Sequence, residues 1–291
     1  VVRGGLSAAV VERELVGGEC SYWACMPTKA LLRSGSALQA ARRLPGAREA
    51  ITGTLDPAAV LRRRDEFASN WHDDGQVAWL DQAGIALFRG HGRLAAPRVV
   101  EVTGEDGAVV TLTARHAVVV ATGSSALVPD IPGLRDAAVW TSREAVATDS
   151  VPRRLGIIGG GVVAGEMATA FSALGSAVTV LARDGVLPTA EPFAGERVTE
   201  ALREAGASVR DGAEVVAVRR DAQGEVHLTL VDGEKIVVDE VLVAIGRTPN
   251  TRDLGLDTIG LEPGTWLTVD QTLRVLDESG APVGDGWLYA A

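Results

Sequence analysis

The chain of 291 residues contains only two cysteines, Cys20 and Cys25, with four residues between them. A zinc site needs four ligands, and none of the four histidines lies near the pair in the sequence, so no metal site is expected. Cys25 comes two residues before Pro27, at an expected helix start, where the helix dipole lowers the pKa of a thiol. Lys29, one turn further on the same face, adds a positive charge.

These features favour a redox-active cysteine pair. A structural disulfide is the weaker interpretation, because thiols are kept reduced in the cytoplasm. Two inert buried cysteines are the remaining alternative, and the position of Cys25 at a helix start argues against it.

A second chemical signal is the glycine-rich turn Gly159-x-Gly161-x-x-Ala164, which lies between a predicted strand, 155–158, and a predicted helix, 162–174. In dinucleotide-binding folds the first glycine makes a tight turn, and the second lets the backbone approach a pyrophosphate at the positive end of the helix. In this strand–turn–helix context the pattern predicts an NAD(P) site. The alternative is a glycine-rich turn that binds nothing.

The end of the next predicted strand, 177–181, bears on the choice of nucleotide. An acidic residue there binds the ribose 2′-hydroxyl of NAD, whereas an arginine suits the 2′-phosphate of NADP. Here the strand is followed by Ala182 and Arg183, which favours NADP over NAD, and the neighbouring Asp184 weakens that preference.

The composition of the chain excludes several classes of protein. Apolar residues make up 46% and charged residues 23%, which is typical of a globular protein. The net charge of −10 argues against nucleic acid as a partner, because phosphate binding needs a basic face. No apolar run approaches the roughly 20 residues that cross a membrane, and no signal peptide is visible. We therefore expect a cytoplasmic protein that binds neither nucleic acid nor membrane.

The order of predicted elements indicates an α/β fold. Strands are expected at 7–12, 85–88, 99–102, 109–112, 116–121, 155–158, 177–181, 214–219, 225–231, 235–238, 241–245 and 287–291. Helices are expected at 27–43, 57–84, 162–174 and 192–205. A proline-rich loop at 128–133 precedes a restart of the pattern near residue 151, which predicts a domain boundary there.

Four motifs occur in order along the chain. They are Gly17-Gly18-x-Cys20-x4-Cys25-x-Pro27-x-Lys29-Ala-Leu-Leu, then Ala121-Thr122-Gly123, then Gly159-x-Gly161-x-x-Ala164-x-Glu166, and finally Gly246-Arg247-x-Pro249-Asn250. With these motifs the chain resembles the pyridine nucleotide–disulfide oxidoreductases, which include dihydrolipoamide dehydrogenase, mercuric reductase and glutathione reductase.

The resemblance implies two nested Rossmann-like, three-layer nucleotide-binding domains. An FAD domain would occupy 1–150, an inserted NAD(P) domain 151–270, and the return to the FAD domain 271–291, and the family's interface domain would be absent. The start at Val1 rather than Met, and the apolar end at Tyr289-Ala290-Ala291, suggest a fragment truncated at both ends.

The resemblance also implies roles for the motif residues. Cys25 would be the flavin-side cysteine, Cys20 the cysteine that meets the substrate, and Glu166 the partner of Lys29 beside the flavin. Glu12 would bind the adenosine ribose of FAD. The other implied cofactor residues are Gly17, Gly18, Lys29, Ala121, Thr122 and Gly123 for FAD, Gly159, Gly161, Ala164 and Arg183 for NAD(P), and Gly246 and Arg247 at the hinge back to FAD. From the residues alone, Arg247 is equally a surface cation.

The activity that the resemblance implies is dihydrolipoamide dehydrogenase-like. Electrons would pass between NAD(P)H, FAD, the Cys20–Cys25 pair and a small-molecule disulfide or dithiol, in a parent protein that is a homodimer. The alternatives are mercuric reduction, a quinone reductase or diaphorase that does not use the cysteines, and, for this stretch alone, a non-catalytic NAD(P)-binding module. The bulky Tyr22 and Trp23 between the cysteines either narrow substrate access or only pack.

Overall fold

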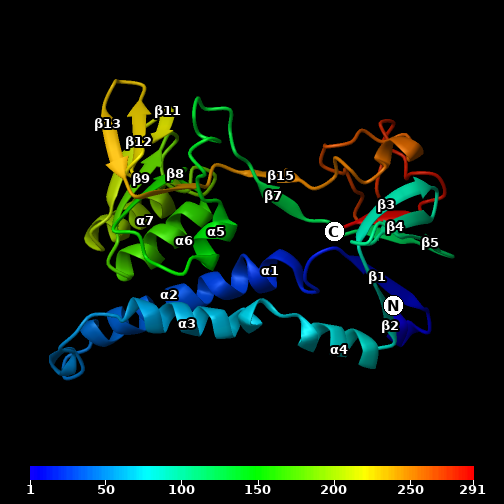
Figure 1. Ribbon diagram of the computed structural model, residues 1–291, viewed down its shortest axis with the longest axis horizontal. Coiled ribbons are helices and arrows are strands. Elements are labelled where there is room, and N and C mark those ends of the chain that lie inside the picture. The colour runs from blue at the N-terminus through cyan, green and yellow to red at the C-terminus, as the bar shows by residue number, and fades with distance from the viewer. The chain divides into compact units, whose positions relative to one another are not determined.

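A computed structural model describes residues 1–291, and the chain divides into two compact units. Unit 1 contains Val1–Gly18, His72–Ser125 and Arg247–Ala291, and unit 2 contains Glu19–Trp71 and Ala126–Gly246. The main chain therefore passes between the units repeatedly, as the colours of Figure 1 show. These divisions differ from the expected boundaries at residues 150 and 270, and the assignment of cofactors to domains stays a prediction.

The centre of unit 2 is a parallel sheet of four strands in the order β10-β9-β8-β14. Helix α6 connects β8 to β9, and helix α7 connects β9 to β10. This order with these crossovers is that of one half of a Rossmann fold. The bounds are β8 Arg154–Ile158, α6 Val162–Ala173, β9 Ala177–Ala182, α7 Pro192–Glu204, β10 Ser208–Asp211 and β14 Glu240–Val243.

A second, antiparallel sheet in unit 2 packs against the first. Its strands are β11 Val215–Arg220, β12 Val226–Leu230 and β13 Lys235–Val238, in that order. A Cβ atom at Gly156 of β8 would lie 3.2 Å from Leu228 and 3.4 Å from Val238, so the absent side chain allows the close approach. Leu228 and Val238 belong to a buried cluster that also includes Leu134 and Val241.

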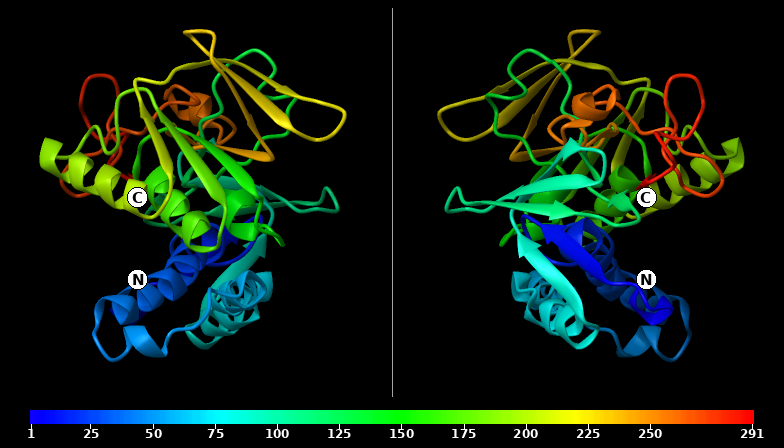
Figure 2. Two further views of the ribbon diagram at one scale, coloured as in Figure 1. Left: turned by 90° about the vertical axis from the view of Figure 1, so that its left-hand side faces the viewer. Right: turned by 90° about the vertical axis from the view of Figure 1, so that its right-hand side faces the viewer.

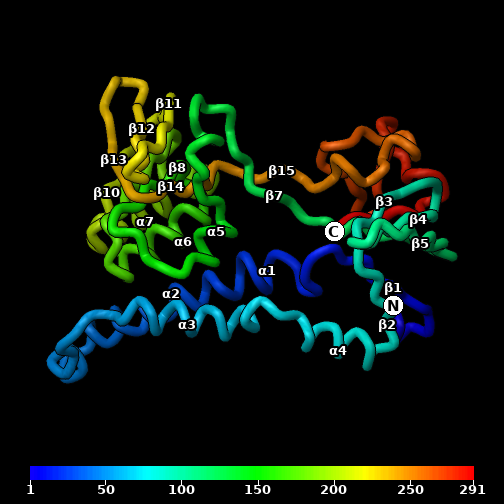
Figure 3. The backbone as a smooth tube through the Cα atoms, viewed as in Figure 1, coloured from blue at the N-terminus to red at the C-terminus, as the bar shows by residue number.

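Unit 2 also contains the cysteine segment and a helical hairpin. The helices are α1 Gly18–Tyr22, α2 Cys25–Arg43, α3 Pro57–Phe67 and α5 Ser142–Ala147, with a short 3-10 helix, η2, at Arg48–Ala50. Helices α2 and α3 run side by side (Figure 3). Leu31, Val60 and Leu61 from this hairpin share one buried cluster with the sheet residues Leu155 and Ile157. That shared core explains why the segment 19–71 belongs with the later part of the chain.

The expectation of one helix over 57–84 is wrong. Helix α3 ends at Phe67, and Ser69, Asn70 and Trp71 all have positive φ angles, 52°, 50° and 56°. A right-handed helix cannot continue through that conformation. The chain forms a short 3-10 segment, η3 Ser69–Trp71, and a separate helix, α4 Asp74–Gln82, which belongs to unit 1.

Unit 1 is built from small sheets. β1 Ala8–Glu12 pairs in parallel with β2 Ile85–Arg89, as the blue and cyan strands of Figure 2 show. The other pairs are β6 Val118–Val120 with β16 Leu288–Ala290, and β7 Ser124–Ala126 with β15 Arg247–Pro249. An antiparallel sheet contains β3 His91–Ala96, β4 Val99–Thr103 and β5 Val109–Thr113, and the 3-10 helices are η1 Val2–Gly4 and η4 Leu256–Ile259.

The two parallel pairs of unit 1 are not hydrogen-bonded to each other. The second of the two expected Rossmann-like sheets is therefore not present as one continuous sheet. The chain has a mixed α/β architecture. Trp287, Leu256 and Val275 are buried together in the core of this unit. None of the helices combines the length and the apolar character needed to span a membrane.

Candidate active site

The two cysteines lie in two successive helices of unit 2. Cys20 is in the short helix α1, and Cys25 is the first residue of α2, with Ala24 at the N-cap. The predicted helix start is thus confirmed, two residues earlier than Pro27. Both cysteines are free thiols and both are exposed, so reagents from solution reach each of them.

The thiol of Cys25 influences the protonation of Cys20. Hydrogen bonding with Cys25 raises the pKa of Cys20, and burial and the charge of Cys25 act in the same direction. The charge of Lys29 opposes this shift. Cys20 therefore keeps its proton to a higher pH than an ordinary cysteine does. The division of labour between the two cysteines stays a prediction.

Lys29 and Glu166 form an ion pair, with 2.5 Å between Nζ and Oε1. The pair joins α2, which begins at Cys25, to α6, which follows the glycine turn. The pairing that the resemblance implies is present, and Glu166 is not an isolated solvated carboxylate. The pair is accessible to solvent, because the side chain of Lys29 is 62% exposed and that of Glu166 is 28% exposed. The role of the pair toward a flavin stays a prediction.

The three glycines of the turn before α6 are each explained by different surroundings. Gly159 has a φ of 125°, and a Cβ there would lie 2.2 Å from the carbonyl oxygen of Ala244. A Cβ at Gly160 would lie 2.1 Å from the carbonyl oxygen of Gly185. Gly161, in contrast, is the N-cap of α6, and its missing Cβ points into open space. The motif had singled out Gly159 and Gly161 but not Gly160.

The open space in front of α6 suits an anion. No side chain caps the first turn of this 12-residue helix. Its first backbone N–H groups have no partners within the helix, and together with the helix dipole they favour a phosphate group. Ala164 is fully buried in the core of unit 2, as suits a third motif position that packs the helix closely on the sheet.

Arg183 and Asp184 follow directly after β9 and bind each other. The distance from the Arg183 guanidinium to Asp184 Oδ2 is 2.9 Å, and the side chains are 68% and 62% exposed. The hydrogen bond raises the pKa of Arg183 and lowers that of Asp184. Arg183, the predicted phosphate-binding cation, is thus already paired with the carboxylate of Asp184. A hollow of about 340 Å³ begins at Gly185 and Val186 and continues along α7.

Glu12 is the last residue of β1 in unit 1, and its Oε1 accepts the backbone N–H of Glu14 at 2.8 Å. A hollow of about 520 Å³ lies beyond this strand end, lined by Arg13, Glu14, Arg89, Gly90 and residues 104–106. A carboxylate at the carboxyl end of a parallel strand, next to a hollow, suits the hydroxyl groups of a ribose.

Asp73 and Arg89 hold the loop that follows Glu12, and the sequence had not singled them out. Asp73 Oδ2 accepts the N–H of Val16 at 2.7 Å and pairs with Arg89. Burial acts to raise the pKa of Asp73, but the hydrogen bonds from Arg89 and Val16 lower it. The loop leads to Gly17 and Gly18, whose φ angles of 120° and 62° favour glycine.

The motif at 121–123 and the motif at 246–250 meet in unit 1. The carbonyl of Thr122 accepts the side-chain amide of Asn250 at 3.0 Å, and the carbonyl of Gly123 accepts its backbone N–H at 3.0 Å. Arg247 donates through Nε to Ser124 Oγ at 2.6 Å and also binds the Ser124 carbonyl. Arg247 is therefore not merely a surface cation.

Of the remaining members of these motifs, Gly246 accepts the backbone N–H of Leu127 at 3.0 Å through its carbonyl. Ala121 is exposed just after β6, and Gly246 is exposed with a φ of 150°, just before β15. Both stand at strand ends, beside the hydrogen-bonded residues of their motifs.

Comparison with known proteins decides the family. The family described as pyridine nucleotide-disulphide oxidoreductase matches residues 1–282. The chain belongs to this family. Its members are FAD-dependent oxidoreductases that use NAD(P). For NAD(P), the uncapped N-terminus of α6 and the open space at Gly161 fit the cofactor. For FAD, the position of Glu12 at the end of β1 fits a ribose.

Among the relatives of this pyridine nucleotide-disulphide oxidoreductase chain are several mercuric reductases. The protein from Shigella flexneri is 35% identical over 98% of the chain, and that from Acidithiobacillus ferrooxidans is 34% identical over 98%. The chain spans about half the length of these relatives, 51% and 52%.

Solved structures agree with this family. LpdA from Mycobacterium tuberculosis superimposes with a TM-score of 0.80 at 27% identity, over 98% of this chain and 61% of LpdA. The HOCl-induced flavoprotein disulfide reductase RclA from Escherichia coli also gives a TM-score of 0.80, at 21% identity, over 99% of this chain and 60% of RclA. The likeness to RclA shows the fold alone.

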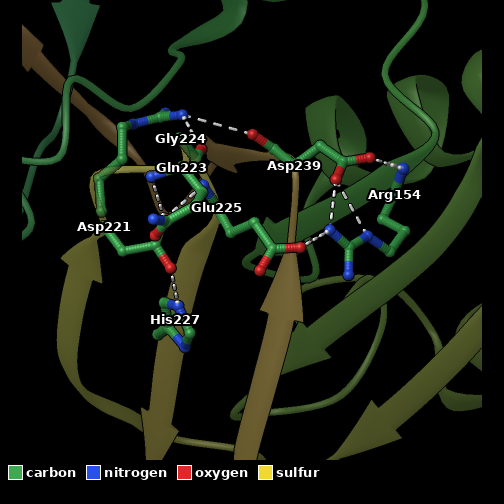
Figure 4. Close-up of polar contacts among 8 residues, drawn as sticks. Arg154, Asp221, Gln223, Gly224, Glu225, His227 and Asp239 are labelled. Atoms are coloured by element: carbon green, nitrogen blue, oxygen red, sulfur yellow. Dashed lines mark hydrogen bonds and ion pairs between the residues drawn. The ribbon is translucent and has the colours of Figure 1, made fainter.

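A separate cluster in this family member lies on the β11–β12 hairpin: Asp221, Glu225 and His227 (Figure 4). The three side chains are already engaged in hydrogen bonds and ion pairs within the protein. Asp221 contacts His227 Nε2 at 2.6 Å and accepts the backbone N–H of Glu225 at 3.0 Å, and Glu225 pairs with Arg154 at 2.6 Å. Asp239 and Glu225 together raise the pKa of Arg154. A metal ion would have to displace this guanidinium from Glu225, so we assign the cluster to the stability of the hairpin.

Proposed function

We propose that this chain is the nucleotide- and thiol-carrying part of an NAD(P)H-dependent dithiol–disulfide oxidoreductase. The observation that carries the proposal is the placement of two exposed thiols, one within α1 and one at the start of α2, with the Lys29–Glu166 pair one turn further along α2. Bound FAD and NAD(P)H supply the electron pair. The contribution of the chain is to hold the two sulfurs, keep the proton on Cys20 and present Cys20 to the substrate.

A second candidate is mercuric reduction, because relatives that are 34–35% identical are named mercuric reductases. Mercuric ion is a soft cation and favours thiolate ligands, so an exposed cysteine pair suits it as a substrate. Both candidates need Cys20 and Cys25. They differ in whether the full-length protein reduces a disulfide such as lipoamide or instead a mercuric thiolate complex.

Replacing Cys20 by serine tests the proposal in the full-length protein. We expect NAD(P)H-dependent reduction of lipoamide, glutathione disulfide or mercuric thiolate to fall by about 100-fold or more, since a serine hydroxyl can form neither the Cys20–Cys25 disulfide nor a sulfur bond to the substrate. Ser21→Ala, in the same short helix, is the matched control and should retain the activity. Undiminished turnover in Cys20→Ser would overturn the proposal in favour of a quinone reductase or diaphorase type of reaction.

We also propose that the nucleotide is NADPH and that Arg183 binds its 2′-phosphate. Arg183→Ala is expected to weaken binding of 2′,5′-ADP by about tenfold, which is the value of one charge-assisted contact of about 1.4 kcal/mol. Asp184→Ala is expected to strengthen it, because it releases the guanidinium from its present partner. Calorimetric titration with 2′,5′-ADP and 5′-AMP measures both effects. An equal loss for the two ligands in Arg183→Ala would contradict the assignment.

A further inference from the structure

The short helix α5 is held at both ends by hydrogen bonds. At its N-terminus, Thr141 accepts the N–H of Arg143 at 3.2 Å, and Glu144 accepts the N–H of Thr141 at 2.7 Å, which together form a capping box. At its C-terminus the buried Arg64 of α3 donates to the carbonyls of Val146 and Thr148. A helix of six residues is not stable by itself, so these caps fix its position in unit 2.

Arg143 extends from this fixed helix to the segment that carries the cysteines. Its Nε donates to Glu19 Oε2 at 2.9 Å, and a terminal nitrogen lies 2.8 Å from the same oxygen. Its guanidinium carbon lies 4.1 Å from the centre of the Trp23 ring. Glu19 immediately precedes Cys20, and Trp23 lies between the two cysteines. One guanidinium thus contacts the segment on both sides of Cys20.

The aromatic residues between the cysteines, Tyr22 and Trp23, pack this segment against the core of unit 2. Tyr22 is fully buried, its ring centre is 5.6 Å from that of Trp23, and Trp23 packs against the main core of unit 2. Of the two roles considered from the sequence, packing is therefore the one that the structure supports. Trp23 lies between this core and Arg143, and the backbone from Glu19 to Cys25 is anchored between them.

We propose that Arg143 is a positioning residue of the redox pair: by binding Glu19 and Trp23 it keeps Cys20 and Cys25 adjacent. The inference rests on the proposed function, because it assumes that these thiols form a disulfide. A disulfide requires the two Cα atoms to lie within about 4.4–6.8 Å of each other. The two thiols already lie within hydrogen-bonding reach of each other. A segment held in this way loses less conformational freedom when the bond closes, so the clamp stabilises the disulfide relative to the dithiol.

The two partners of Arg143, a carboxylate and an aromatic ring, suit arginine and not lysine. Arginine presents a planar fork that donates more than one hydrogen bond to a carboxylate and stacks on an aromatic ring at the same time. A lysine ammonium keeps the charge but does not fill both roles. Charge attraction alone therefore predicts that Arg143→Lys behaves like the native chain, whereas positioning predicts that it lies between the native chain and Arg143→Gln.

The test is the equilibrium of the 291-residue chain with reduced and oxidised glutathione. Two electrons and two protons pass from the Cys20 and Cys25 thiols to glutathione disulfide, which becomes two glutathione thiols. We expect Arg143→Gln to lower the equilibrium constant for disulfide formation about tenfold, which corresponds to a reduction potential about 30 mV higher. Trapping of free thiols and mass measurement give the oxidised fraction.

Two further variants separate positioning from general loss of structure. Glu19→Gln removes the same ion pair from the other side, so it should shift the equilibrium in the same direction, and the double variant with Arg143→Gln should shift less than the two effects added. Arg210→Gln is the matched control, because Arg210 binds Glu234 at 2.9 Å through an exposed pair elsewhere in unit 2. A shift of equal size in Arg210→Gln would overturn the inference.

The outcomes distinguish this inference from the proposed function. If the native chain forms no reversible Cys20–Cys25 disulfide at any glutathione ratio, the proposed function fails. If it forms the disulfide and Arg143→Gln leaves the equilibrium constant unchanged, only the role of Arg143 is refuted. A tenfold shift with an unchanged melting temperature supports both.

Discussion

Replacing Arg64 by leucine is expected to lower the free energy of unfolding by about 3–5 kcal/mol. The side chain of Arg64 is 1% exposed, and its guanidinium binds Asp65 and the carbonyls of Val146 and Thr148. These carbonyls belong to the C-terminal end of α5, where the last C=O groups have no partners within a helix. Leucine fills part of the space but leaves buried acceptors without donors, and that loss of hydrogen bonding is the main cost.

Chemical denaturation of the chain measures this effect. Arg62→Leu is the matched control, because Arg62 lies on the same helix and is exposed to solvent. It should change the free energy of unfolding by no more than about 0.5 kcal/mol. If the two variants lose the same amount of stability, the bonds from Arg64 to α5 are not what holds these helices together.

The second large effect concerns the glycine turn before α6, where two alanine substitutions should behave differently. Gly161→Ala is expected to leave the melting temperature unchanged, because the new Cβ enters open space and the backbone has an ordinary φ of −75°. It should nevertheless weaken NADPH binding by at least about tenfold, since the methyl group occupies the approach to the N–H groups of α6. Calorimetric titration with NADPH on the 291-residue chain measures this loss.

Gly159→Ala should lower both the melting temperature and the affinity for NADPH. Its φ of 125° is unfavourable for any side chain, and its Cβ would meet the carbonyl oxygen of Ala244 at 2.2 Å. We expect the variant to unfold at a lower temperature and to bind NADPH weakly because the turn is displaced. Native NADPH affinity in Gly161→Ala would show that the pyrophosphate does not bind at this turn.

Sequence alone predicted the elements whose signal is local. The strand–turn–helix over residues 154–173 was visible from buried apolar runs and a glycine turn, and the structure contains it within one residue of the predicted ends. The helix after Cys25 was likewise visible from Pro27 and the apolar spacing that follows. The break at Ser69–Trp71 was not, because neither glycine nor proline marks it.

The contacts that hold the candidate site depend on distant pairs and were not predictable. Arg143 and Glu19 lie 124 positions apart, and nothing near either residue distinguishes them from ordinary surface charges. Arg64 reads as one of three consecutive arginines on a charged helix, and only the fold shows that it is the buried one. The Lys29–Glu166 pair was anticipated, but through the family resemblance and not through any local signal.

The division of unit 2 into two separated stretches has a consequence for synthesis on the ribosome. The hairpin of α2 and α3 emerges early, but the sheet that covers Leu31, Val60 and Leu61 begins only at Arg154. Because synthesis proceeds at roughly 5–20 residues per second, this apolar face stays uncovered for several seconds before the sheet is made. The nascent chain is therefore a natural client for chaperones that bind exposed apolar helices, and pauses in translation between the two stretches should increase its aggregation.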